Sequence, residues 1–205
     1  MSIWNRLFSH KEIAVAAALA VSGYAGAAVT TWNCELSIPA NSTGYFINVD
    51  ARTYGTANVT GWDLQIYADS TAPSIVFYCA TNAGIQRGTP PFGLPAANLP
   101  ADTVVGSTSP MTLGGPIQAT FSTGGQQSGG VWYLNAVNYF GFKFQGSDGF
   151  VHYGYGKMTV GANANVRTLN FLTYETTPGV GLIVPAPGVL AMVGVAGLTR
   201  ARRRR

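Results

Sequence analysis

Few side chains in this sequence could carry acid–base or metal chemistry. His152 is the only histidine after residue 27. A metal site needs about three or four ligands and a catalytic triad needs a base beside a nucleophile, yet His152 has neither a second histidine nor a Gly-x-Ser-x-Gly turn to join it. We therefore predict that His152 is a hydrogen-bonded strand residue and that Asp148, in Ser147-Asp148-Gly149, is a turn residue. We predict no catalytic, metal-binding or cofactor-binding residue.

Paired carboxylates are the other chemistry to consider. Glycoside hydrolysis needs two acids roughly 5–10 Å apart. The central part of the chain contains seven acids: Glu35, Asp50, Asp63, Asp69, Asp102, Asp148 and Glu175. No local motif selects two of them. A hydrolase that depends on Asp148 or Glu175 therefore remains only a third hypothesis, behind the two described below.

The two cysteines, Cys34 and Cys79, could form a disulfide. An even number of cysteines favours a bridge if the chain is exported, as the N-terminal segment described below predicts. It would close a loop of about 45 residues, tie the N-terminal strand to the third one, and contribute on the order of 4 kcal/mol. Two buried free thiols are the alternative.

Several aromatic residues have flat apolar faces with polar edges, on which sugar rings can stack. They are Trp32, Trp62, Trp132, Tyr133, Tyr139, Tyr153 and Tyr155. We expect most of them to be core, because a domain of this size needs large buried residues. Tyr153 and Tyr155 are two residues apart and so point to one face of their strand. If that face is solvated, they form a glycan-stacking patch, and if the rings are buried there is no patch.

The elements that must position these residues are strands. Trp62, Leu64 and Ile66 alternate with polar residues or tyrosine, and residues 139–145 alternate Phe with Gly, Lys and Gln, so each segment has one buried face. Further strands are predicted at 44–49, 74–79, 116–121, 131–134, 150–160 and 166–174. The short loop 146–149 predicts an antiparallel hairpin of 139–145 with 150–160.

Strands at this spacing, without crossover helices, predict an all-β fold. We expect a single antiparallel β-sandwich or jelly-roll-like domain over residues 28–178, flanked by an N-terminal signal peptide helix and a C-terminal hydrophobic helix. Residues 87–116 contain six prolines and several glycines, which predicts a long surface excursion that wraps the domain.

The charge of the chain is concentrated at its ends. The formal net charge is +4, but the first 27 residues carry +1, the C-terminal arginines carry +5 and the region between them carries −2. The composition, with 10% charged and 47% hydrophobic residues, argues against intrinsic disorder. The folded part should therefore be mildly acidic, and we predict no nucleic-acid partner.

The N-terminus has the three parts of a secretory signal peptide. Arg6 and Lys11 precede the apolar stretch 13–21, which is followed by Ala25-Gly26-Ala27. The apolar stretch is too short to cross about 30 Å of hydrocarbon. We predict a signal peptide over residues 1–27, cleaved by signal peptidase between Ala27 and Ala28.

The C-terminus combines a proline box, an apolar run and arginines. Pro185-Ala186-Pro187-Gly188 precedes an uncharged stretch to residue 199, and Arg200, Arg202, Arg203, Arg204 and Arg205 follow. An apolar span of about 188–199 would be held with its arginines on the cytoplasmic side. We therefore assign residues 179–205 to a C-terminal sorting segment.

This tripartite ending resembles the sorting signal of PEP-CTERM proteins. Ala186 stands where that family usually has Glu. The resemblance implies recognition by the membrane transpeptidase exosortase, processing near the box, and delivery to the cell surface or exopolysaccharide matrix of a Gram-negative-type bacterium.

Together these features predict an exported, exosortase-sorted surface or matrix protein with a structural or adhesive role and no catalysis. The alternative is a lectin-like carbohydrate-binding module for exopolysaccharide. The precursor would be anchored in the membrane during sorting. Exosortase and signal peptidase are the expected processing enzymes.

Overall fold

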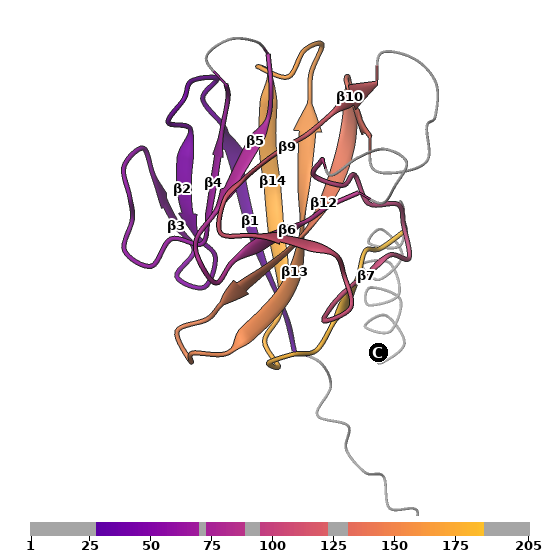
Figure 1. Ribbon diagram of the computed structural model, residues 1–205. Coiled ribbons are helices and arrows are strands. Elements are labelled where there is room, and N and C mark those ends of the chain that lie inside the picture. The colour runs from indigo at the N-terminus through magenta and orange to yellow at the C-terminus, as the bar shows by residue number, and fades with distance from the viewer. Residues whose placement is uncertain (1–27, 70–72, 89–94, 123–130, 187–205) are drawn as a thin grey trace, which may run out of the picture.

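The computed structural model describes residues 28–69, 73–88, 95–122 and 131–186 (Figure 1). These residues form fifteen strands and contain no helix. The prediction of an all-β fold built from antiparallel sheets is therefore confirmed. The two predicted terminal helices lie outside the described residues.

The larger of the two main sheets has six strands, and every pairing in it is antiparallel. In spatial order its strands are β1 (Val29–Ser37), β14 (Arg167–Glu175), β13 (Val151–Val160), β12 (Ala136–Gln145), β6 (Gly84–Gln86) and β8 (Met111–Leu113). The predicted hairpin is confirmed, because β12 and β13 pair antiparallel from Gln145 and Val151 at the turn outward.

The second main sheet has five strands and is also antiparallel throughout. Its spatial order is β3 (Thr53–Gly55), β2 (Tyr45–Asn48), β4 (Leu64–Tyr67), β5 (Val76–Cys79) and β9 (Pro116–Gln118). A short parallel pair joins β10 (Phe121–Ser122) to β11 (Trp132–Tyr133).

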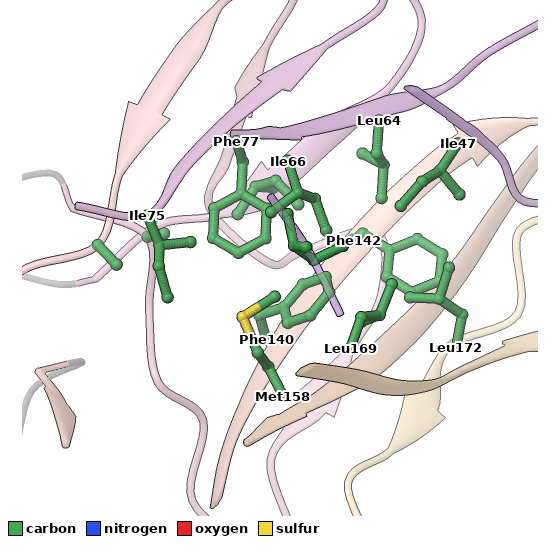
Figure 2. Packing of buried hydrophobic residues seen from close by; sticks show 14 of the residues in the cluster. Ile47, Leu64, Ile66, Ile75, Phe77, Phe140, Phe142, Met158, Leu169 and Leu172 are labelled. Atoms are coloured by element: carbon green, nitrogen blue, oxygen red, sulfur yellow. The ribbon is translucent and has the colours of Figure 1, made fainter. Parts of the chain in front are cut away.

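The main core lies where the inner faces of these two sheets meet. Ile47, Leu64, Ile66 and Phe77 from the five-stranded sheet face Phe140, Phe142, Met158, Leu169 and Leu172 from the six-stranded sheet (Figure 2). Alternate residues of a strand point to the same face, and Phe140, Phe142 and Phe144 of β12 are accordingly all fully buried in this core. This packing is consistent with a β-sandwich.

Two glycines on the inner face of β13 make room for the phenylalanines of β12. Gly154 pairs with Phe142 and Gly156 pairs with Phe140. A Cβ at Gly154 would lie 2.6 Å from Phe142 Cζ, and one at Gly156 would also run into the Phe140 ring. The rings therefore occupy the space that side chains at these two positions would otherwise fill.

A second apolar cluster covers the outer face of the six-stranded sheet. Tyr153, Tyr155 and Phe171 from the sheet pack under buried residues of the proline-rich region and the C-terminal end, namely Ala97, Leu99, Val105 and Val184. The predicted surface excursion is therefore partly wrong. It wraps the domain, but it also contributes β8 to the sheet and its own residues to a core.

The folded part extends past the predicted boundary at residue 178. Strand β15 (Leu182–Ile183) pairs antiparallel with β7 (Val104–Val105). Val184 is fully buried, its N–H donates to Thr103 O (2.9 Å), and its carbonyl accepts from Asp102 N–H (2.8 Å). The first residues assigned to the sorting segment are thus part of the domain.

Candidate functional site

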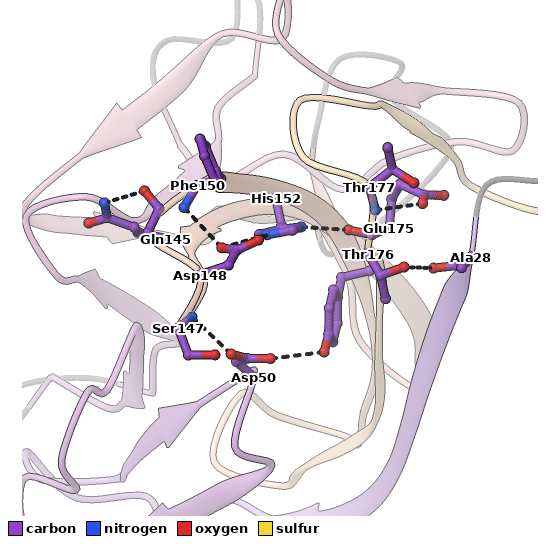
Figure 3. A network of polar contacts seen from close by, with 12 residues as sticks. Ala28, Asp50, Gln145, Ser147, Asp148, Phe150, His152, Glu175, Thr176 and Thr177 are labelled. Carbon is purple, nitrogen blue, oxygen red and sulfur yellow. Dashed lines mark hydrogen bonds and ion pairs between the residues drawn. The ribbon is translucent and has the colours of Figure 1, made fainter. Parts of the chain in front are cut away.

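His152 belongs to a polar network at one end of the six-stranded sheet (Figure 3). Its Nδ1 lies 2.9 Å from Glu175 O, and its Nε2 lies 3.1 Å from Asp148 Oδ2. Both ring nitrogens thus face oxygens. The prediction of a hydrogen-bonded strand residue is confirmed.

Asp148 shapes the β12–β13 turn. Its Oδ1 accepts from Phe150 N–H at 2.9 Å, and this bond lowers the pKa of its carboxyl group. The predicted turn role is therefore confirmed. Among the described residues, no group of three or more His, Cys, Asp or Glu is arranged to hold a metal ion.

Glu175 contributes its backbone carbonyl to this network, while its side chain is directed to the following turn. The carboxylate is fully buried and its Oε1 accepts from Thr177 N–H at 2.9 Å. Within the described residues, Oε2 has no hydrogen-bond partner. The Glu175 carboxylate thus meets Thr177, whereas the Asp148 carboxylate meets His152.

The predicted disulfide is wrong, because Cys34 and Cys79 are free thiols in the structure. Cys34 lies on β1 and its Sγ donates to Leu169 O of the neighbouring strand at 3.3 Å. Cys79 lies on β5, in the other main sheet, and is buried in the core. Burial raises the pKa of Cys34 to about 11 and that of Cys79 to about 12.

The predicted glycan-stacking patch at Tyr153 and Tyr155 is also wrong. Both rings point to one face as expected, but their exposed fractions are only 8% and 6%. The second cluster covers this face, and Tyr155 packs edge-on against Phe171 with ring centroids 6.0 Å apart. These rings cannot stack on a sugar.

Accessible aromatic rings lie instead on the outer face of the five-stranded sheet. Trp62 packs edge-on against Phe46 (5.3 Å between ring centroids) and tilted against Tyr78 (6.1 Å). Gln65 pairs with Phe46 on one side and Tyr78 on the other, so the three strands present them in one row. Tyr78 is 38% exposed.

Trp62 departs from the predicted alternation. The strand begins at Leu64, while Trp62 lies in the preceding loop, half-buried over the outer face, and Asp63 is buried. Asp63 is fixed by Val49 N–H, which donates to its Oδ2 at 2.8 Å. The pKa of Asp63 is raised to about 7 because burial outweighs the hydrogen bond from Val49, which lowers it, and the charge of Asp50 adds a smaller raising effect.

One hollow adjoins Trp62 at this end of the molecule, and a second lies next to it. One, of about 290 Å³, is lined by Trp62, Asp63, Asn82 and Gln145 among others. The other, of about 460 Å³, is lined by Asn48, Asp50 and Ser147, and both hollows share Gly61 and Gln145. These volumes lie at or near the usual range for small-ligand sites, about 300–1,000 Å³.

The polar side chains around the hollows are held in place. Asn82 Nδ2 donates to Gln145 Oε1 (2.5 Å), and Gln145 Nε2 donates to Gly149 O (2.7 Å). Ser147 N–H donates to Asp50 Oδ2 at 2.9 Å, and hydrogen bonding from Ser147 lowers the pKa of Asp50 (Figure 3). Sequence reasoning missed these residues because they lie far apart in the chain: Asn82 in the turn after β5, Gln145 at the end of β12 and Asp50 in the turn after β2. Their only signal was their residue type.

The terminal signals lie mostly outside the described residues. Ala28 is described and its carbonyl accepts from Thr176 N–H at 2.9 Å, whereas Ala27 is not described. Pro185 and Ala186 are half-buried directly after Val184. The remaining sorting-signal residues, Pro187, Gly188, Arg200, Arg202, Arg203, Arg204 and Arg205, are not described. No helix in the described part of the chain is long and apolar enough to cross a membrane.

No protein-family model, no curated protein and no solved structure matches this chain.

Proposed function

We propose that this chain is an exported protein of the bacterial cell surface or extracellular matrix, with a structural or adhesive role and no catalytic activity. One observation carries the proposal: a signal-peptide pattern, a β domain, a proline box, an apolar run and terminal arginines follow one another in that order. Signal peptidase and exosortase would act on the two ends, and the membrane would hold the precursor between those steps.

The limits of the described fold support this order. Strand β1 begins at Val29, just after the expected cleavage between Ala27 and Ala28, and β15 ends at Ile183, just before Pro185. Cleavage at the first point would remove nothing from the sheets. Processing at or after the box would likewise leave the buried Val184 in place. The domain would be a single β-sandwich of jelly-roll type, with helical terminal segments.

A second candidate is a carbohydrate-binding module. Accessible aromatic rings beside hollows lined by amide and carboxylate groups favour it. Such a protein would attach to exopolysaccharide of the surface or biofilm, which is compatible with the adhesive role. A nucleic-acid partner is not proposed, because the arginines fit a membrane flank.

Fractionation of the native host tests the export proposal. The protein should be found in the surface or matrix fraction, and mass spectrometry should show an N-terminus at Ala28 and a C-terminus without the arginines. A host strain without exosortase should retain the arginine-bearing form in the membrane fraction. A surface form that still carries Arg200–Arg205, or a form found only in the cytoplasm, would overturn the proposal.

A chain with Arg200 and Arg202–Arg205 changed to Ser isolates the role of the arginines. It should still lose its signal peptide but should no longer be sorted. A matched control changes Arg52 and Arg87, which lie within the folded part. The control should reach the surface like the native chain.

A further inference from the structure

The outer face of the five-stranded sheet carries three neighbouring aromatic rings, and one of them, Trp62, is held in place by the other two. Trp62 is clamped between Phe46 and Tyr78, with ring centroids 5.3 and 6.1 Å away. A clamped ring loses little conformational freedom when a ligand stacks on it, and its apolar face suits the C–H face of a pyranose.

The two hollows provide both hydrogen-bond donors and hydrogen-bond acceptors. The Asn82–Gln145 hydrogen bond joins the turn after β5 to the end of β12 and so fixes both amides. Asn48 is fixed in the same way, since its Nδ2 donates to Thr60 O (2.9 Å) and its Oδ1 accepts from Ala51 N–H (2.8 Å). Amides held like this keep further lone pairs and N–H groups for sugar hydroxyls.

A glycine keeps the space between the two hollows open. Gly61 lines both of them and has φ +68°, a left-handed conformation that favours glycine. A Cβ there would come within 2.9 Å of Asn48 Nδ2. The two hollows therefore adjoin at Gly61, which suits a chain of sugar units rather than a single small molecule.

The charges around the hollows select among sugar polymers. Asp50 lines the larger of the two hollows, and no Lys or Arg lines either one among the described residues. Carboxylates next to a uronic acid or sulfated sugar would repel it, because like charges are unfavourable at short range. A neutral polymer meets no such penalty.

We propose that this region binds a neutral polysaccharide, with the Trp62 indole as the stacking surface and Asn82, Gln145 and Asn48 as the groups that recognise hydroxyls. The inference rests on the adhesive role proposed above and gives it a ligand class and a site. Phe46 and Tyr78 position Trp62, and Asp50 excludes acidic sugars.

Calorimetric titration of the full chain tests the proposal. The ligands are cellohexaose, mannohexaose and xylohexaose as neutral probes and hexagalacturonate as the acidic probe. We expect binding of at least one neutral probe and none of the acidic one. Trp62→Ala should weaken binding roughly tenfold or more, as expected for a central aromatic contact. Asn82→Ala and Gln145→Ala should each weaken it about three- to tenfold, and they keep the test valid if Trp62→Ala fails to fold.

Phe150→Ala is the matched control, because this ring is exposed but lines neither hollow. Its affinity should equal that of the native chain. The proposal is overturned if no neutral probe binds, if only hexagalacturonate binds, or if Trp62→Ala and Asn82→Ala both leave affinity unchanged.

Cell fractionation separates this proposal from the export proposal. The Trp62→Ala chain should still reach the surface fraction. A surface-located native chain that binds no neutral probe would overturn the polysaccharide site and leave export standing. A chain that binds but stays in the cytoplasm would overturn export and leave the site standing.

Discussion

The two main sheets differ most on their outer faces. The six-stranded sheet carries Tyr153 and Tyr155 there, and both are covered by the proline-rich region and the C-terminal end of the domain. The five-stranded sheet carries Phe46 and Tyr78, with Trp62 packed beside them, and Tyr78 remains exposed. An aromatic ring on an outer face is therefore available to a ligand only where no other segment covers it.

Removing the C-terminal residues that cover the outer face of the six-stranded sheet should have the largest effect on stability. A chain that ends at Pro178 loses β15 and the buried Val184 side chain, together with backbone bonds to Asp102 and Thr103. We expect it to be about 4 kcal/mol less stable to unfolding than a chain that ends at Ala186. Urea unfolding of the two truncated chains measures the difference. Equal midpoints would mean that β15 does not stabilise the covered face.

Truncating one ring on each outer face compares the faces directly. Tyr155→Ala removes a ring that packs against Phe171 and Tyr139, and it should cost about 3 kcal/mol of unfolding free energy. Tyr78→Ala removes an exposed ring and should cost less than about 1 kcal/mol. Chemical unfolding of both variants is the measurement, and a reversed order would contradict the assignment of covered and open faces.

Asp63, beside the open face, should make stability depend on pH. Its pKa is raised from 3.8 to about 7 in the folded chain, so the folded state binds the extra proton between these values. Its stabilising effect is fully present below about pH 4 and is lost as pH rises through about 7. The loss of unfolding free energy should be on the order of 2 kcal/mol. It is smaller than the pKa shift alone implies, because Asp63 borders an open hollow in which solvent screens its charge.

Asp63→Asn isolates that contribution. The amide oxygen can still accept from Val49 N–H but carries no titratable proton. Unfolding midpoints of the variant should vary less between pH 5 and pH 8 than those of the native chain. A variant whose midpoints vary with pH as much as those of the native chain would contradict the assignment of this pH dependence to Asp63.

The thiols should show the smallest effect on stability. Because Cys34 and Cys79 are free, adding a reductant should not change the unfolding midpoint. A thiol reagent should detect two sulfhydryls in the denatured, unreduced chain and should react slowly with the folded one at pH 8, since both pKa values are raised. Detection of no free sulfhydryl would restore the disulfide.

Predictions that depend only on neighbouring residues were correct for the β12–β13 hairpin. The alternating phenylalanines and the turn at 146–149 were sufficient to predict the β12–β13 hairpin and its inward face. His152 and Asp148 were assigned correctly because each bonds within the hairpin turn or to the adjacent strand.

Predictions that required knowledge of distant segments were wrong. The disulfide was inferred from the number of cysteines and from compartment, but β1 and β5 belong to different sheets and the two thiols remain unjoined. A local pattern failed as well at Trp62, which was placed by alternation although the alternation begins only at Leu64. The folded part runs past residue 178 because β15 pairs with β7, a strand far earlier in the chain.

The sequence by itself determined that this chain folds mainly as antiparallel strands, because period-two alternation and turn residues act over a few neighbouring positions. It also determined where the aromatic residues lie along those strands. Only the tertiary structure decided that Tyr153 and Tyr155 are buried while Trp62 borders an open hollow. The physical reason is that the exposure of a ring depends on which remote segment packs over it, and contacts between remote segments leave no local pattern in the sequence.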